Sequence, residues 1–284
     1  MSNSVGRASL PAPLDERDRG APSMLDPFAI NRRQFAVIVG AAALPAVPYT
    51  AESLVAQFQQ SLTADQKRAL TFPFDHPLRS VAYNNWKIVE PRIEDLAKPQ
   101  RDHCRAILES LCTDDGLKRF DRQMSDDYGG FSKYHVAVFG EPGASRSEWV
   151  MTGRHLTIRA GGASSVIPKG PLFFGHSAER RENLWDAPGK HARALFASLD
   201  PAKQKRASEA EGIATEALDP DQAKHIRLLA DALTQPFRRA AMPLVNLDGT
   251  RIRLNREGRV WKLEGRDFAW FHHADPHAHC WLTV

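Results

Sequence analysis

Histidines are concentrated near the carboxyl end of the chain, where His277 and His279 are separated by one residue. On a β-strand, residues i and i+2 project from the same face, about 7 Å apart along the strand. Two imidazoles at that spacing can tilt onto one metal ion, because each metal–nitrogen bond is about 2 Å long. His273 can add a ligand if the chain turns back at Asp275-Pro276, since proline favours a bend. The pattern predicts a metal site and leaves the reaction open.

The composition is that of a soluble globular protein with a substantial core. Of the 284 residues, 42% are hydrophobic and 25% are charged. The net charge of +4 comes from basic residues that alternate with acidic ones, so we expect no nucleic-acid binding. Cys104 and Cys112 lie about 12 Å apart along a predicted helix, too far for a disulfide. The chain has no CxxC motif, which argues against a zinc ribbon or a thioredoxin-type site.

The first 50 residues are predicted to be a disordered leader followed by an export signal. Met1–Asn31 is rich in Ser, Pro, Arg and Asp and has no apolar period. Arg32 and Arg33 then precede the mildly apolar run Phe35–Val47, which is typical of a twin-arginine signal and too short to span a membrane. A buried helix after two chance arginines is the alternative. We expect the twin-arginine machinery to carry the protein, already folded, to the periplasm or outside the cell, which favours a cofactor loaded before export.

Residues 51–284 are predicted to form a single α+β domain with helices packed on an antiparallel sheet. Four segments carry helix-start signals, a capping Thr or Asp or a proline at the first helical position with Gln soon after. They begin at Leu62, Leu96, Leu199 and Leu218. Short β-branched and aromatic runs separated by turns predict the strands. These are Tyr134–Phe139, Trp149–Thr152, His155–Arg159, Ser165–Ile167, Leu172–Phe174, Arg251–Leu254, Val260–Leu263, Phe268–Phe271 and His277–Val284.

Five short motifs in order resemble the family named domain of unknown function 3500. They are Phe139-Gly140-Glu141-Pro142, Trp149, Gly153-Arg154-His155-Leu156, Pro171-Leu172-Phe173-Phe174-Gly175 and His277-x-His279. The resemblance matches His155 to the second histidine of a family pair and the late H-x-H to His277 and His279. It therefore implies a metal held by these three histidines. Three imidazoles with an open position suit Cu, Fe or Zn.

Two arginines are candidates for binding a carboxylate substrate through a two-pronged contact. On a regular strand, Arg154 alternates with His155, whereas Arg159 shares the face of His155. We therefore select Arg159 as a substrate-binding candidate, with a solvent-facing arginine as the alternative.

Three further polar residues stand beside predicted turns. His176 is a second substrate-binding candidate or a fourth ligand, with a surface turn histidine as the alternative. Asp126 and Asp127 follow a predicted helix, and no partner for a paired carboxylate role is evident from the sequence.

These features favour an exported metal-dependent enzyme acting on a small molecule, an oxidoreductase before a hydrolase. Histidine-only ligands and the export of a folded protein motivate that order. The alternatives are a non-catalytic periplasmic protein that binds a metal or another ligand, and a family member whose site has decayed. No G-x-S-x-G, P-loop or dinucleotide motif is present, which argues against serine hydrolases of that fold, nucleotide hydrolases and Rossmann dehydrogenases.

Overall fold

The computed structural model describes residues 51–141, 146–161, 171–178, 182–238, 246–274 and 276–283. All of these belong to one compact unit of the chain. The predicted export signal, the predicted strand Ser165–Ile167 and Asp275 lie outside the described residues. Within the described ranges, no helix is long and apolar enough to cross a membrane. The three cysteines are free and buried, so Cys104 and Cys112 are not joined by a disulfide.

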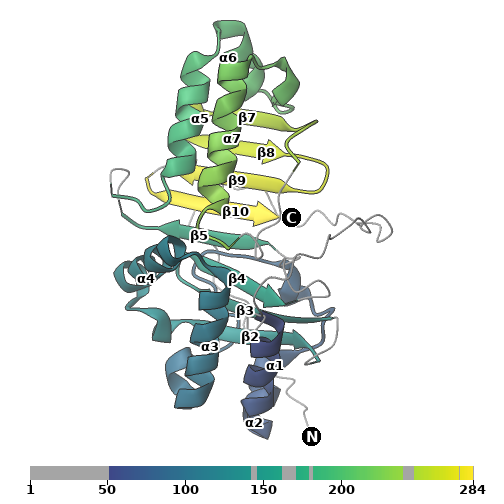
Figure 1. Ribbon diagram of the computed structural model, residues 1–284, viewed down its shortest axis with the longest axis vertical. Helices are drawn as coiled ribbons and strands as arrows, with labels where there is room; N and C mark the ends of the chain where they lie inside the picture. The colour runs from purple at the N-terminus through teal and green to yellow at the C-terminus, as the bar shows by residue number, and fades with distance from the viewer. Residues whose placement is uncertain are drawn as a thin grey trace, which may run out of the picture. The chain divides into compact units, whose positions relative to one another are not determined.

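One sheet of ten strands organises the described residues. The strand order is β1-β2-β3-β4-β5-β10-β9-β8-β7-β6 (Figure 1). Only β1 and β2 pair in parallel, and the other eight pairings are antiparallel. The strands are β1 (Thr71–Phe72), β2 (His135–Gly140), β3 (Ser147–Gly153), β4 (Leu156–Gly161), β5 (Leu172–His176), β6 (Ile213–Ala214), β7 (Arg251–Asn255), β8 (Val260–Glu264), β9 (Ala269–Ala274) and β10 (Ala278–Thr283). The predicted α+β class is confirmed.

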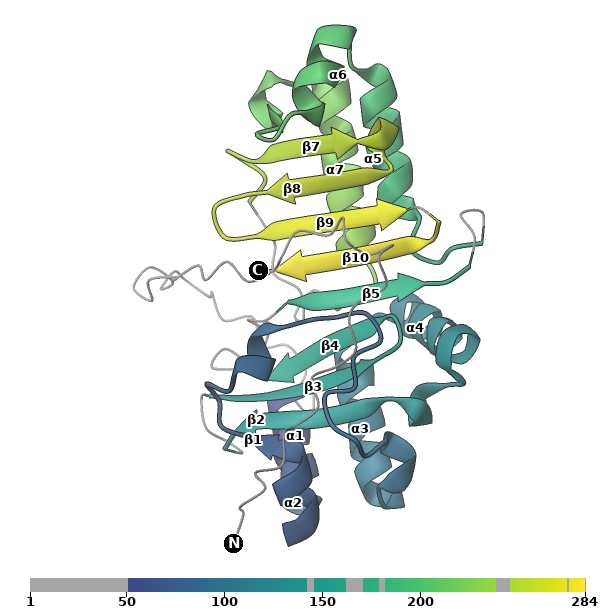
Figure 2. The same cartoon turned by 180° about the vertical axis from the view of Figure 1, so that it is seen from behind.

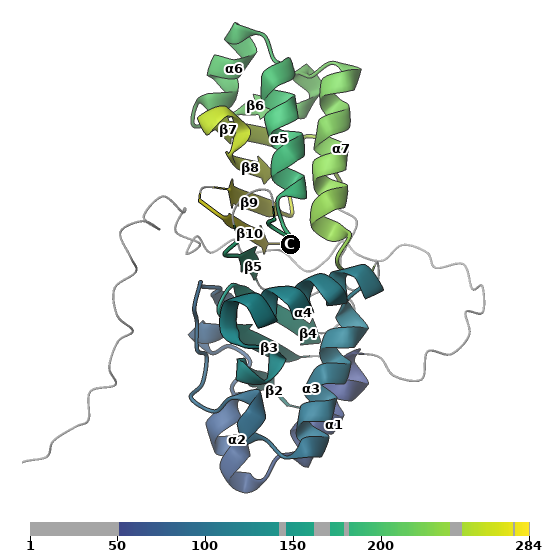
Figure 3. The same ribbon diagram turned by 90° about the vertical axis from the view of Figure 1, so that its left-hand side faces the viewer.

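The α-helices of the described residues are α1 (Ala51–Ser61), α2 (Ala64–Leu70), α3 (Lys98–Leu111), α4 (Asp114–Tyr128), α5 (Ala187–Ser198), α6 (Pro201–Ser208) and α7 (Pro220–Thr234). Helices α1, α3, α4, α5 and α7 lie on one face of the sheet, and α2 and α6 lie at its two ends (Figure 1 and Figure 3). Single 3-10 turns occupy Pro77–Ser80, Ile93–Asp95, Phe131–Lys133, Thr215–Ala217 and Arg256–Gly258. Helices α1 and α3 contact β4, α4 contacts β5, and α5 contacts β8 and β9. Seen from behind, strands β7 to β10 have no helix in front of them (Figure 2).

The predicted helix starts are confirmed by their hydrogen bonds. The side chains of Thr63, Asp200 and Asp219 each accept a hydrogen bond from a backbone N–H in the first turn of α2, α6 and α7. At α3 the arrangement is reversed, because Gln100 Oε1 accepts a hydrogen bond from the backbone N–H of Ala97. Each bond satisfies a polar group that the helix end would leave without a partner.

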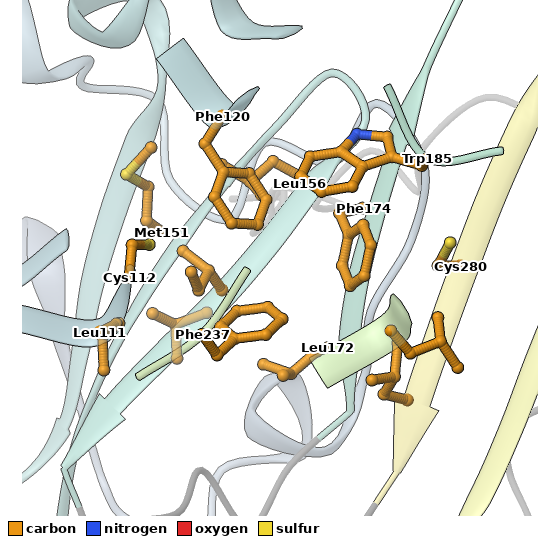
Figure 4. Packing of buried hydrophobic residues seen from close by; sticks show 14 of the residues in the cluster. Leu111, Cys112, Phe120, Met151, Leu156, Leu172, Phe174, Trp185, Phe237 and Cys280 are labelled. Carbon is orange, nitrogen blue, oxygen red and sulfur yellow. The ribbon is translucent and has the colours of Figure 1, made fainter. Parts of the chain in front are cut away.

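An aromatic core fixes β5 against α4 on the helix-covered face (Figure 4). The ring of Phe174 lies 4.8 Å from that of Trp185, which in turn lies 4.8 Å from that of Phe120 in α4. All three side chains are buried, and burial of each contributes about 1.5–3 kcal/mol. Because side chains alternate along a strand, the next residue, Gly175, faces the side of the sheet away from the helices.

The hairpin between β3 and β4 differs from the predicted strand boundary. Gly153 pairs with Leu156, so Arg154 and His155 form a two-residue turn rather than the start of a strand. His155 has a φ of 56°, in the left-handed region that few residues other than glycine occupy. The prediction that His155 continues the strand to Arg159 is therefore wrong at its first residue, because the tight connection needs this turn.

Candidate metal centre

Three histidines from distant parts of the chain meet in one group. The candidate ligand atoms of His155, His277 and His279 all lie within 4.8 Å of one another. The ring of His155 is centred 5.2 Å from that of His277 and 5.0 Å from that of His279, and the last two are 4.6 Å apart. His155 comes from the β3–β4 turn, His277 immediately precedes β10, and His279 is the second residue of β10. We call these three residues the histidine group.

A glycine makes room for the histidine group at the centre of the sheet. Gly175 pairs with His279 on one side and donates its backbone N–H to the His155 carbonyl, at 3.0 Å, on the other. A Cβ at this position would lie 2.7 Å from Cδ2 of His279 and 3.3 Å from Cδ2 of His155. The two rings therefore lean toward each other over a residue without a side chain, on the face away from the helices.

A buried carboxylate orients His155. Its Nδ1 lies 2.7 Å from Oδ2 of Asp127, in the last turn of α4, and the Asp127 side chain is 0% exposed. The other Asp127 oxygen accepts hydrogen bonds from the backbone N–H, at 3.2 Å, and the hydroxyl of Ser177. When Nδ1–H donates to a carboxylate, the lone pair of Nε2 remains available for a metal. The left-handed backbone of His155 is thus stabilised by a side-chain contact that also fixes the ring.

The electrostatics of the site favour neutral rings at His277 and His279 and an ionised carboxylate at Asp127. Burial, together with the nearby His155 and His277, lowers the pKa of His279 to about 2. Burial also lowers the pKa of His277, with further contributions from His155 and from the positive charge of Arg154. Burial by itself raises the pKa of Asp127, but hydrogen bonds from His155 and Ser177 outweigh it and lower that pKa to about 2. Neutral imidazole is the form that binds metals.

A buried nitrogen of the histidine group lacks any partner within the described residues. Nε2 of His279 is buried and makes no hydrogen bond there, and a buried polar atom without a partner costs about 1–3 kcal/mol. Nitrogens bound to one tetrahedral zinc ion lie about 3.3 Å apart. Small ring rotations would therefore bring the three imidazoles into coordination distance. The residues present fit a first-row transition metal.

The candidate third ligand His273 is not part of the histidine group. It pairs with His279 across β9 and β10, and the two ring centres are 6.3 Å apart. His155 occupies the third position instead, because the β3–β4 turn reaches over Gly175 from the opposite side.

Arg159 makes structural hydrogen bonds inside the fold. Its side chain is 0% exposed, so the solvent-facing alternative is wrong. The three guanidinium nitrogens donate to Glu148 Oε1 at 2.6 Å and to the backbone carbonyls of Pro171 at 2.8 Å and Val81 at 2.6 Å. With every nitrogen engaged inside the protein, the residue ties β4 to two connecting segments and does not supply the predicted substrate contact.

His176 also serves the fold and does not join the histidine group. It follows Gly175, so it faces the helices, and it is 1% exposed, which rules out the surface alternative. Its Nε2 lies 3.1 Å from Oδ2 of Asp126, and its Nδ1 accepts a hydrogen bond from the Leu184 backbone N–H. Both ring nitrogens are therefore engaged by protein groups.

The role of Asp126 and Asp127 was not evident from the sequence. Each carboxylate in the last turn of α4 holds one histidine, His176 for Asp126 and His155 for Asp127. One signal was present: acidic residues at a helix C-terminus are disfavoured by the helix dipole by about 0.3–1 kcal/mol. Two in succession there indicate a compensating contact elsewhere in the fold.

The fold and the histidine group define the class of protein: an α+β domain whose central sheet gathers three imidazoles on its helix-free face. The chain belongs to the family described as "Protein of unknown function (DUF3500)", whose model matches residues 50–244. The matched segment includes His155, Gly175 and Asp127 and ends before His277 and His279. No curated protein and no solved structure matches the chain.

Proposed function

We propose that the protein is an exported metal-dependent enzyme in which His155, His277 and His279 hold a Cu, Fe or Zn ion. The observation that carries this proposal is the convergence of the three ligand atoms within 4.8 Å. The buried Nε2 of His279 without a partner in the described residues supports it, as does the contact of Asp127 with His155. Metal-bound histidines usually donate their second N–H to a carboxylate or carbonyl, as His155 does here.

The number of ligands favours catalysis over storage. Structural zinc sites have four protein ligands, whereas catalytic sites have three and leave a position for water or substrate. Within the described residues the group contains three ligands, and His279 projects from the same face of the sheet as Gly175, away from the helices. A metal held in this way can activate water or bind dioxygen. We place an oxidoreductase before a hydrolase, because three neutral imidazoles suit Cu and Fe as well as Zn.

Metal analysis of the purified full chain tests the proposal. Wild type is expected to retain about one metal ion per chain, and His155→Ala, His277→Ala and His279→Ala are expected to lose most of it. His191→Ala serves as a matched control, because His191 lies on α5 on the opposite face of the sheet. Equal metal content in wild type and the three variants would overturn the proposal. The identity of the retained metal then separates the oxidoreductase, expected with Cu or Fe, from the hydrolase, expected with Zn.

We also propose that the twin-arginine machinery exports the protein, on the strength of Arg32-Arg33 and the apolar run after them. Replacing both arginines by lysine in Arg32→Lys/Arg33→Lys should leave the chain in the cytoplasm, as cell fractionation and immunoblotting would show. If the double variant reached the periplasm in the same amount as wild type, the proposed export route would be wrong, and the proposed metal site would be unaffected.

A further inference from the structure

Arg154 stands next to the histidine group on a firmly held turn. It is the other residue of the two-residue connection that carries His155. The Tyr134 hydroxyl donates a hydrogen bond to the Arg154 carbonyl at 2.7 Å, and Gln123 Nε2 donates another at 3.1 Å. Both donor side chains are fully buried. The backbone of this turn is therefore fixed, and the guanidinium extends from a defined position.

The guanidinium of Arg154 forms no hydrogen bond or ion pair with the described part of the chain, and the residue is half-buried. The neighbouring carboxylates are already engaged. Asp127 is bound by His155 and Ser177, and Asp126 is bound by His176 and Arg122.

This arrangement creates a site with excess positive charge. Three neutral imidazoles do not offset the charge of a divalent metal, the Asp127 carboxylate behind His155 offsets only part of it, and Arg154 adds a further positive charge. A guanidinium presents a planar fork that matches a carboxylate or a phosphate through two parallel hydrogen bonds. A lysine could supply only a point charge. The ligand that best matches this charge and geometry is an oxyanion.

We propose that Arg154 is the specificity-determining residue of the centre and that the substrate carries an oxyanionic group, a carboxylate or a phosphate, which Arg154 binds beside the metal. This inference rests on the proposed metal-binding function. The substrate contact that the sequence predicted for Arg159 is assigned to Arg154 instead, because all guanidinium nitrogens of Arg159 bind other groups of the protein.

Anion binding to the metal-loaded full chain tests the inference. Wild type, Arg154→Met, Arg154→Lys and Arg253→Met are loaded with Co(II), and metal content and stability are measured first. Each is then titrated with acetate, inorganic phosphate and imidazole, and the visible Co(II) spectrum is followed. Imidazole is a neutral ligand that reports access to the metal. Arg253→Met is the matched control, because Arg253 is a half-exposed arginine on β7, three strands away from β10.

In wild type at least one of the two anions is expected to bind. Arg154→Met should weaken that binding at least about ten-fold, because it removes the charged hydrogen-bond donors that would hold the anion. Arg154→Lys should recover part of the loss, while imidazole binding and the Arg253→Met control stay at wild-type values. Tighter binding of acetate or of phosphate identifies the anion that the site selects.

Two results would overturn the inference while leaving the metal centre intact. One is an anion affinity in Arg154→Met equal to that of wild type. The other is Co(II)-loaded wild type that binds imidazole but neither anion. A wild-type chain that binds no metal would overturn both this inference and the proposed function.

Discussion

At the scale of single residues, the site depends on which nitrogen of each histidine is available. His155 shows how the choice is made, because its Nδ1 is committed to Asp127 at 2.7 Å. The carboxylate is itself held by Ser177, so the ring cannot rotate without breaking a chain of hydrogen bonds. The side chain that positions the ligand therefore comes from a helix, while the ligand comes from a hairpin turn.

Removing the charge of Asp127 should weaken metal binding with little change in fold. We expect Asp127→Asn to reduce zinc affinity about 10–100-fold, the usual effect of losing a carboxylate that supports a metal-bound histidine. A chelator-competition titration measures this affinity. Asp126→Asn is the matched control, since Asp126 binds His176 on the other face of the sheet and should leave the affinity unchanged. Equal affinity in the two variants would contradict this account of Asp127.

At the scale of secondary-structure elements, the pairing of β5 with β10 creates the site. It brings His279 opposite Gly175, and the β3–β4 turn then reaches Gly175 from the other side. Strands in a sheet are about 4.8 Å apart, so side chains separated by two strands meet only when the residue between them is small. The glycine on β5 is thus as much a part of the site as the histidines.

The substitution Gly175→Ala tests this role. The new methyl group would lie 2.7 Å from the His279 ring and 2.8 Å from the Ala278 carbonyl oxygen, so both must shift. We expect a loss of about 1–3 kcal/mol in the free energy of unfolding and a metal affinity at least about ten-fold lower. Chemical denaturation and chelator competition provide the two readouts.

Gly265→Ala provides the comparison, because its Cβ would meet the Phe268 ring at 2.3 Å in the β8–β9 connection. It should lower stability in the same way and keep wild-type metal affinity. If both glycine variants retained wild-type affinity, Gly175 would have no special role beside the histidines.

At the scale of the whole molecule, a buried histidine makes stability depend on pH. His272 is 0% exposed on the helix-covered face, stacks on Trp261 and lies 3.3 Å from the Trp185 carbonyl. Burial lowers the pKa of His272 to about 3, although the hydrogen bond to Trp185 acts in the opposite direction. The unfolded chain, with an ordinary histidine pKa near 6.5, therefore binds this proton more readily than the folded protein.

The sign of the effect follows from that difference. Because the pKa of His272 is lower in the folded protein than in the unfolded chain, neutral His272 makes its full contribution to the free energy of unfolding above about pH 6.5. That contribution is lost as the pH falls toward 3. Between these pH values, His272 should lower the free energy of unfolding by up to about 1.4 kcal/mol for each unit by which the pH falls. Denaturation of metal-free wild type and His272→Gln at pH 7.5 and 4.5 isolates the contribution, since glutamine keeps a donor and does not titrate. An equal decrease in the free energy of unfolding of the two proteins between pH 7.5 and 4.5 would refute this role of His272.

The part of the structure that local patterns encode was predictable. The α+β class follows from periodicity, and the starts of α2, α6 and α7 follow from Thr63, Asp200 and Asp219, whose caps depend on residues three positions away. The spacing of His277 and His279 likewise placed both side chains on one face of a strand. Helix capping and strand alternation both depend on residues that are only two to four positions apart in the sequence.

What could not be predicted depends on packing between distant segments. Arg159 looked available because its partner Glu148 and the carbonyls that it binds belong to other elements. Asp127 had no visible role because it meets His155 only once α4 docks on the sheet. The backbone of His155 reverses at a turn, so the strand alternation that seemed to turn Arg154 away from the histidine does not apply.

The position of β10 between β5 and β9 also has a consequence for biosynthesis. It is the last of the described strands to leave the ribosome, yet it fills the middle of the sheet. Until it is inserted, the nascent chain exposes two unpaired strand edges, which invite aggregation. His277 and His279 arrive with the same strand that closes this gap, so a metal held by all three histidines could bind only after β10 has been inserted.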